Sequence, residues 1–288
     1  MKLALGTAQF GLPYGIANQS GQVDREEVRQ ILDLARSSGI NTLDTAIAYG
    51  DSEACLGKVG SQGFKVVTKL PGFPHEVSDL YAWVSDQIHA SLHRLSLDSV
   101  YGLLLHHTQQ LIGPRGQSLV HALERLKDQG VVQKIGVSIY SPQELEALTQ
   151  VIKIDLVQAP LNLMDHRLIT SGWLQRLHDQ GVEVHTRSAF LQGLLLMPRE
   201  AIPEKFGAWS HLLDCWHSWL QDNRVTAAEA CLAFVTSNPR IDRIVIGVES
   251  RAQLKELLRA ADMGLPQPLP DLRCDDESLI NPSNWNSL

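Results

Sequence analysis

Short apolar runs alternate with longer amphipathic segments along the 288-residue chain. The apolar runs have the length of buried strands, and they fall at residues 2–6, 40–46, 64–70, 99–107, 132–138, 153–160, 182–190 and 242–248. The segments between them repeat apolar residues at spacings of three and four, which predicts helices at 24–39, 78–96, 116–130, 141–151, 165–181 and 250–262. Strands that alternate with helices predict a parallel sheet with right-handed crossovers.

Eight strand units in a chain of this length predict an α/β fold, a (β/α)8 TIM barrel formed as a single domain over residues 1–288. A doubly wound open sheet is the structural alternative. Three segments are longer than simple connections: residues 108–117 after the fourth strand, residues 191–209 after the seventh, and a C-terminal tail at 263–288. Long loops in a compact barrel are typically functional, so we expect a functional role for these segments.

Composition limits the classes of function. A hydrophobic content of 44% supplies a large core, and a net charge of −7 argues against a nucleic-acid partner. The four cysteines are scattered without a C-x-x-C motif, as expected of buried thiols in a reducing compartment. The apolar run at the N-terminus is too short for a signal peptide, and no segment has the length of a membrane span. We expect a soluble, cytoplasmic protein without a membrane partner, whose oligomeric state stays open.

Polar residues stand where several predicted strands end. The second strand ends on Asp44, the third on Lys69 and the fourth on His106 and His107. The carboxyl ends of barrel strands form the catalytic face. A buried charge costs several kcal/mol unless it is paired, so we expect Asp44 and Lys69 to pair across neighbouring strands. Tyr49 follows Asp44 closely and is expected above this pair, together with His106.

This set of residues is suited to one kind of chemistry. A phenol is a poor proton donor at neutral pH, but a nearby cation stabilises the phenolate. Lys69 supplies such a cation, and Asp44 holds Lys69 in place and charged. The neutral imidazole of His106 orients a substrate oxygen. The sequence therefore predicts that Tyr49 protonates a carbonyl oxygen while a hydride arrives at the carbon.

Three stretches of the chain resemble the motifs of the aldo/keto reductase family. They are "LDTAIAYGDSEACLG" at 43–57, Lys69 in "VVTKL" and His106 in "DSVYGLLLHH". The resemblance runs along essentially the whole chain. It implies a catalytic tetrad of Asp44, Tyr49, Lys69 and His106, which reduces an aldehyde or ketone to an alcohol with Tyr49 as the acid. His106 is preferred to His107 because it falls eight residues after Asp98, as in the family pattern.

The resemblance also implies how NADPH or NADH is held. "KIGVS" and "LVQAPLN" resemble the segments that contact the nicotinamide carboxamide, "RSAFLQGLL" resembles the loop over the pyrophosphate, and "IVIGVESRAQLKELL" resembles the segment at the adenosine end. The implied cofactor-binding residues are Ser138, Gln158, Arg187, Ser188, Phe190, Gly193, Gly247, Glu249, Ser250, Arg251 and Gln253. No G-x-G-x-x-G motif occurs, as expected of a barrel that binds the dinucleotide in an extended form.

The chain departs from the family pattern at positions that bear on the cofactor. Ile139 stands where an asparagine usually follows the serine of the fifth strand, and Arg187 replaces the aromatic residue that stacks on the nicotinamide. Glu249 disfavours a 2′-phosphate, because binding one needs a cation or several donors, whereas Arg251 and Lys255 favour it. Taken together, Glu249, Arg251 and Lys255 predict a slight preference for NADPH over NADH.

Two other functions are possible for a barrel of this kind: a metal-dependent enzyme and a non-catalytic binding protein. A metal-dependent barrel enzyme needs several ligands at strand ends, often an H-x-H on the first strand, and "LALGTAQFG" has none, so no metal is expected. A non-catalytic nucleotide-binding or scaffold protein on the same barrel is the alternative, which the intact tetrad disfavours. Polar loop residues predict a small polar or sugar-like carbonyl substrate; they are His107, Gln109, Arg115 and Gln192. The tail, with Trp285, is a hypothetical roof of the substrate site.

Overall fold

The computed structural model describes residues 1–18, 20–262, 264 and 268–288. Eight parallel strands close into a barrel in sequence order, with the last strand paired to the first. The strands are β1 (Leu3–Gly6), β2 (Thr42–Asp44), β3 (Lys65–Leu70), β4 (Val100–Leu105), β5 (Val132–Ser138), β6 (Leu156–Pro160), β7 (Glu183–Arg187) and β8 (Arg243–Gly247). The predicted (β/α)8 barrel is confirmed, because an open sheet lacks the pairing of β8 with β1.

The strand register explains why polar groups gather at one end of the barrel. Side chains alternate between the inside and the outside of a barrel strand. Val67, Leu104 and Leu156 form a small apolar cluster that is separate from the main core. Two residues further along β3 and β6, on the same faces, come Lys69 and Gln158. Lys69 and Gln158 therefore lie at the carboxyl ends of their strands, directly above the small apolar cluster inside the barrel.

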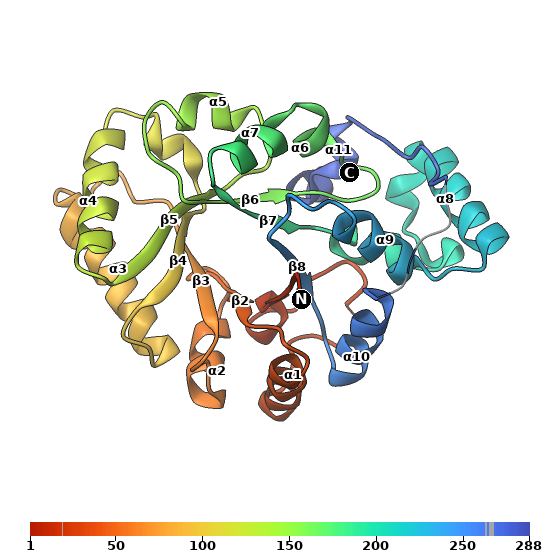
Figure 1. The fold of residues 1–288 in the computed structure, drawn as a ribbon, viewed down its shortest axis with the longest axis horizontal. Coiled ribbons are helices and arrows are strands. Elements are labelled where there is room, and N and C mark those ends of the chain that lie inside the picture. Colours follow the sequence, from red (N-terminus) through yellow and green to blue (C-terminus); the bar gives the residue numbers. More distant parts are fainter. Residues whose placement is uncertain (19, 263, 265–267) are drawn as a thin grey trace.

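Helices surround the strands (Figure 1), and α10, α1, α2, α3 and α4 pack side by side in that order. The helices are α1 (Arg25–Ser37), α2 (Ser52–Val59), α3 (Leu80–Leu95), α4 (Gly116–Asp128), α5 (Glu144–Leu148), α6 (Arg167–Thr170), α7 (Trp173–Asp179), α8 (Ser210–Asn223), α9 (Ala227–Thr236), α10 (Arg251–Ala260) and α11 (Glu277–Ile280). Buried apolar residues recur on the inner faces of α1, α3, α4 and α10, as their sequence patterns predict.

Two of the predicted helices differ from the observed ones. The pattern at 141–151 is helical only over the five residues of α5. The pattern at 165–181 is divided into α6 and α7 by Gly172, whose φ of 78° is left-handed and ends the first helix. Asp24 caps α1 by accepting hydrogen bonds from the backbone N–H groups of Glu26 and Glu27. The Glu27 side chain accepts a hydrogen bond from the backbone N–H of Arg251 at 2.5 Å, and this contact ties α1 to the start of α10.

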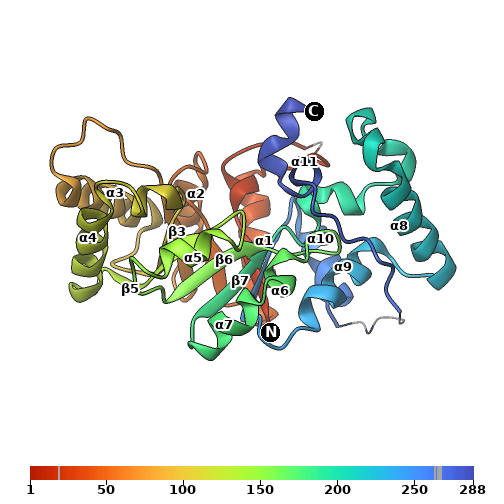
Figure 2. The same cartoon turned by 90° about the horizontal axis from the view of Figure 1, so that it is seen from above.

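The long segment after β7 is more ordered than a loop. Residues 191–209 form three 3₁₀ segments, and two helices that the sequence analysis did not identify follow them, α8 and α9. Figures 1 and 2 both place α8 at the outer edge of the molecule. The C-terminal tail packs against this segment, where the ring of Trp285 meets that of Phe206 edge-on at 4.9 Å.

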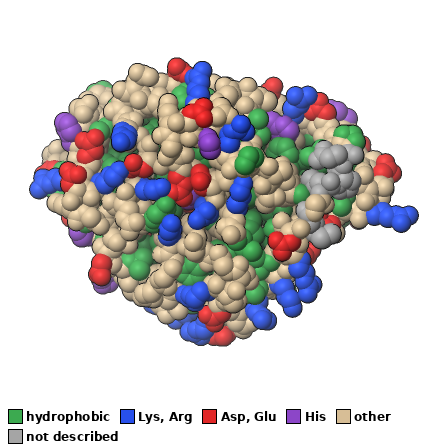
Figure 3. Space-filling view, in the orientation of Figure 1, with side chains coloured by type: hydrophobic (Ala, Val, Ile, Leu, Met, Phe, Trp, Pro, Cys, Tyr) green, Lys and Arg blue, Asp and Glu red, His purple; other side chains and the backbone are tan. Residues whose placement is uncertain are grey.

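The surface carries both signs of charge. On the face seen in Figure 3, acidic and basic side chains are intermixed rather than gathered into one basic stripe. No helix in the described part of the chain is both long enough and apolar enough to cross a lipid bilayer.

Candidate active site

Asp44 and Lys69 form a buried ion pair at the carboxyl ends of β2 and β3. Lys69 Nζ donates to Asp44 Oδ1 at 2.7 Å and to the carbonyl oxygen of Thr45 at 2.9 Å. Gln158 on β6 donates from Nε2 to the other carboxylate oxygen, Asp44 Oδ2, at 2.7 Å. Burial, the largest single influence, would lower the pKa of Lys69, but the charge and hydrogen bond of Asp44 together with the neighbouring Tyr49 outweigh burial, and the pKa is raised. Lys69 is therefore a fixed cation.

Tyr49 lies over this pair. The centroid of its ring is 4.9 Å from Nζ of Lys69, and its backbone N–H donates to the carbonyl oxygen of Ala46 at 3.0 Å in the turn after β2. This turn packs tightly against the first loop, since a Cβ at Gly11 would stand 1.9 Å from the carbonyl oxygen of Tyr49. A glycine at position 11 is what allows the close approach that supports the Tyr49 turn.

His106 completes the group of four. Its ring meets the ring of Tyr49 edge-on, with centroids 6.1 Å apart. Burial, helped by the positive charge of Lys69, lowers the pKa of His106 to about 4, so its imidazole is neutral at physiological pH. His107 is exposed and stands 6.2 Å from the His106 ring. The structure thus places His106, rather than its neighbour, against Tyr49.

A cleft of about 920 Å³, counted with the open space at its mouth, begins at Asp44 and Tyr49 and continues between β1, β7 and β8. Eight of the residues implied in cofactor binding line it: Gln158, Arg187, Ser188, Phe190, Gly193, Gly247, Glu249 and Gln253. The other three lie outside its lining: Ser138, Ser250 and Arg251. The cleft therefore joins Asp44 and Tyr49 to most of the implied cofactor site, while Lys69 and His106 lie outside its lining.

Gln158, which lines the cleft, carries a buried atom without a hydrogen-bond partner. Its Nε2 is held by Asp44, but its Oε1 is buried and accepts no hydrogen bond from any residue that the structure describes. Ser138, the last residue of β5, is Gln158's partner in the strand register and is 4% exposed. A buried acceptor without a donor costs free energy, so this position is suited to a ligand N–H group.

Arg187 ends β7 and reaches across the ends of two neighbouring strands. Its Nη2 donates to the carbonyl oxygen of Ile139 at 3.0 Å, and its Nη1 donates to Ser188 Oγ at 3.2 Å. The guanidinium lies over the ring of Tyr140, 4.7 Å from the centroid. No acidic residue in the described ranges forms an ion pair with Arg187, so no carboxylate offsets its charge directly.

The loop after β7 is strained and meets the loop after β1. Ser188, Leu191 and Gln192 all have positive φ, at 63°, 47° and 52°. The carbonyl oxygen of Gln192 accepts from the N–H of Ile16 at 3.1 Å, and its side-chain Nε2 donates to the Tyr14 hydroxyl at 3.1 Å. The two loops therefore enclose the cleft between them, and residues in positive-φ conformations are typical of ligand-binding loops.

Sequence reasoning missed the part of the cleft that β1 and its loop contribute. The lining residues there are Gly6, Thr7, Ala8, Gln9, Tyr14, Gly15, Ala17 and Asn18. The run "GTAQFGLPYG" contains three glycines and follows directly on a buried strand, which is the signal that points to them. These residues carry no charge, so a search for ionisable groups passes over them. Asn162, by contrast, shapes the neighbouring loop by donating to the carbonyl oxygen of Ser188 at 3.1 Å.

Glu249 and its neighbours form the start of α10. Glu249 lines the cleft, and burial raises its pKa above the ordinary value. Its backbone N–H donates to Gln253 Oε1 at 2.7 Å, and Ser250 caps the helix by accepting from the N–H of Gln253 at 3.1 Å. The side chains of Arg251 and Lys255 are exposed and do not line the cleft. The acidic group thus stands nearer to the cleft than the two basic ones.

The described tail residues take no part in the cleft. Trp285 is 4% exposed, and its Nε1 donates to the carbonyl oxygen of Leu279 at 2.8 Å. Trp285 packs against Phe206. The tail residues 268–288 line no part of the cleft. Within the described ranges no three His, Cys, Asp or Glu side chains are arranged to hold a metal ion.

Comparison with known proteins identifies the family and supports the fold. The model of the aldo/keto reductase family matches residues 2–268. The uncharacterized oxidoreductase YqkF of Bacillus subtilis is 23% identical over 91% of this chain and 91% of its own length. A probable voltage-gated potassium channel subunit beta of Arabidopsis thaliana is 25% identical over 91% of this chain and 89% of its own length.

A solved structure shows the same fold. The aldo-keto reductase AKR11C1 from Bacillus halodurans, in its holo form, is 22% identical to this chain and superposes with a TM-score of 0.72. The match covers 94% of this chain and 89% of that one. With the family model matched over nearly the whole length, this chain belongs to the aldo/keto reductase family.

Proposed function

We propose that this protein reduces an aldehyde or ketone to an alcohol with a nicotinamide dinucleotide, and that Tyr49 is the proton donor. The observation that carries the proposal is the group of Asp44, Lys69, Tyr49 and His106 beside one cleft. A buried ion pair is costly, and apolar residues of similar volume would stabilise a barrel at least as well. A cation fixed against a phenol is explained by acid catalysis rather than by packing.

The residues of the cleft fit a nicotinamide dinucleotide. The unpartnered Oε1 of Gln158 needs an N–H donor, which the amide of a nicotinamide carboxamide provides. The cleft then extends past the strained loop after β7 to Glu249 and Gln253, a path suited to an extended ligand. The bound dinucleotide would supply the hydride.

The tetrad would supply the proton. Tyr49 donates its hydroxyl proton to the carbonyl oxygen, and the ammonium of Lys69 stabilises the phenolate that is left. Asp44 keeps Lys69 charged and in place, and Gln158 holds Asp44 from the other side. His106, which is neutral, donates a hydrogen bond to the same substrate oxygen and orients it. Tyr49 is only half-buried, so it regains a proton from solvent.

We propose NADH as the preferred cofactor, in place of the slight preference for NADPH that the sequence predicts. Glu249 lines the cleft, while Arg251 and Lys255 point into solvent. A carboxylate beside the ribose repels a 2′-phosphate and accepts hydrogen bonds from ribose hydroxyl groups. A substrate that is small and polar stays our proposal, since Gln192 and Tyr14 line the cleft. Arg115, in contrast, lies over Phe73 and outside the cleft.

The test is a titration of the protein with NADH and with NADPH, followed by quenching of tryptophan fluorescence. Binding of one or both supports the dinucleotide site, and NADH is expected to bind more tightly. A panel of short hydroxy-aldehydes and long apolar aldehydes then tests turnover. Binding without turnover of any carbonyl would favour the alternative, a barrel that binds nucleotide without catalysis. Binding of neither dinucleotide at millimolar concentration would contradict the reductase proposal.

A further inference from the structure

Arg187 places a positive charge over the ends of three adjacent strands. It is the last residue of β7, and its guanidinium donates to the carbonyl oxygen of Ile139, directly after β5. β6 runs between β5 and β7 and carries Gln158. The guanidinium therefore crosses above the pair of Ser138 and Gln158, on the wall of the same cleft that contains Tyr49.

The charge of Arg187 is not neutralised by its surroundings. Its hydrogen-bond partners among the described residues are a carbonyl oxygen and a serine hydroxyl, both uncharged. Asp44, which lines the same cleft, is already paired with Lys69. The positive charge of Arg187 also contributes, after burial and other charges, to the lowered pKa of His106, so its field reaches the catalytic group. An arginine stays protonated at any physiological pH.

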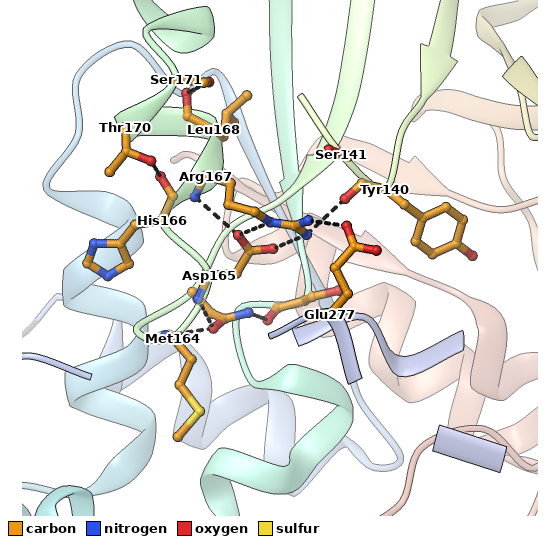
Figure 4. A network of polar contacts seen from close by, with 12 residues as sticks. Tyr140, Ser141, Met164, Asp165, His166, Arg167, Leu168, Thr170, Ser171 and Glu277 are labelled. Carbon is orange, nitrogen blue, oxygen red and sulfur yellow. Dashed lines mark hydrogen bonds and ion pairs between the residues drawn. The ribbon is translucent and has the colours of Figure 1, made fainter. Parts of the chain in front are cut away.

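Tyr140, and the residues that fix its backbone, hold the guanidinium of Arg187 in place. The ring of Tyr140 supports one face of it at 4.7 Å. Figure 4 shows the network that fixes the Tyr140 backbone: Arg167 donates to the carbonyl oxygen of Tyr140 at 3.0 Å and pairs with Asp165 and Glu277. Asp165 is fully buried, so this anchor is rigid. Arg187 is thus preorganised before any ligand arrives.

A nicotinamide ring in this cleft would lie against Arg187. This step rests on the proposed function. The ring has to bring its hydride close to a carbonyl carbon whose oxygen contacts Tyr49, and the unpartnered Oε1 of Gln158 marks the place for the carboxamide. Arg187 spans the strand ends around Gln158, so the guanidinium and the ring become neighbours.

We propose that Arg187 makes the site discriminate between the redox states of the cofactor and bind the reduced form more tightly. The reduced nicotinamide ring is uncharged. When it gives a hydride to the carbonyl carbon, it loses two electrons and becomes a cation, while the oxygen takes the proton of Tyr49. A fixed guanidinium repels this cationic ring in a cleft of low dielectric constant. The oxidised cofactor is released more readily, and the protein favours carbonyl reduction over alcohol oxidation.

Equilibrium binding tests this directly. The dissociation constants of NADH and NAD⁺, or of NADPH and NADP⁺ if that pair binds better, are measured by tryptophan fluorescence for the wild type and for Arg187→Gln. The ratio of the oxidised to the reduced dissociation constant is expected to fall by roughly tenfold in Arg187→Gln, which corresponds to about 1.4 kcal/mol. Arg187→Lys keeps the charge and is expected to retain most of the ratio.

Arg176→Gln is the matched control. Arg176 also lies over an aromatic ring, that of Trp173 at 5.0 Å, but its side chain is 57% exposed and outside the cleft. This variant loses the same charge and is expected to keep the wild-type ratio. An unchanged ratio in Arg187→Gln, or an equal weakening of both redox forms, would overturn the inference. Failure of the wild type to bind any of the four dinucleotides would overturn the proposed function instead, and the inference with it.

Discussion

The ammonium group of Lys69 lies 2.7 Å from a carboxylate oxygen of Asp44, and both side chains are almost completely withdrawn from solvent. Each charge is stable only because the other is present, since an unpaired charge at this depth would be strongly disfavoured. The pair is also the foundation of the proposed site, because Tyr49 and Gln158 are both positioned on it. Changes to either residue should therefore affect folding stability as well as activity.

Asp44→Asn should lower the free energy of unfolding by about 3–5 kcal/mol, because it leaves a buried ammonium without its counter-charge. Urea unfolding measures the change. The double variant Asp44→Leu with Lys69→Met removes both charges and should be much closer to the wild type in stability, while it loses reductase activity. A single variant as stable as the wild type would show that Lys69 is not held as a cation by Asp44.

Tyr49→Phe should reduce the rate of carbonyl reduction by roughly 10²–10⁴-fold, because it removes the proposed proton donor and keeps the ring. The dissociation constant of the dinucleotide should stay nearly unchanged. Steady-state kinetics and the fluorescence titration measure the two effects separately. A variant that keeps most of the wild-type kcat would remove Tyr49 from the role of acid.

His106 should stay neutral well below the pH at which an ordinary histidine is protonated. Burial and the charge of Lys69 lower its pKa to about 4 from the ordinary value of 6.5. Between these two pH values the unfolded chain binds a proton at this residue and the folded chain does not, so His106 makes the fold less stable as the pH falls. An NMR titration of the imidazole should show a midpoint near the lower value, and Lys69→Met should raise it. A midpoint above pH 6 would contradict this assignment.

Glu249→Lys should shift the cofactor preference toward NADPH, because it replaces a carboxylate in the cleft with a cation that attracts the 2′-phosphate. The ratio of the dissociation constants of NADH and NADPH measures the shift. Glu256→Lys is a suitable control, since Glu256 lies on the exposed face of α10. Equal ratios in wild type and Glu249→Lys would place Glu249 outside the cofactor site.

Arg167→Met should destabilise the fold by about 3–5 kcal/mol, because the fully buried carboxylate of Asp165 loses its cation. Glu277, the other acidic partner of Arg167, is 58% exposed. Glu277→Gln should therefore cost at most about 1 kcal/mol, as exposed ion pairs do. Urea unfolding of the two variants separates the buried contact from the surface one. Similar losses in both would show that the network seen in Figure 4 depends on the tail rather than on Asp165.

Some elements could be predicted from the sequence because their signals are local. Each barrel strand is a short apolar run, and each of the helices α1, α3, α4 and α10 buries one stripe of residues. The helix α9 gave no such signal, because apolar residues surround it on most sides and hide its periodicity. The helix α2 has only eight residues, and one of the residues it buries is an acid, Glu53, paired with Arg94.

By itself the sequence determined the order of the eight strands, and it predicted the four residues of the proposed tetrad, since each of these ends or follows an apolar run. Only the tertiary structure decided which polar groups meet across the barrel. Gln158 holds Asp44, Gln192 holds Tyr14, and Arg187 reaches Ile139, all between residues far apart in the chain. Such contacts depend on the closure and register of the sheet and on the path of the loops, and no local pattern of hydrophobic and polar residues encodes them.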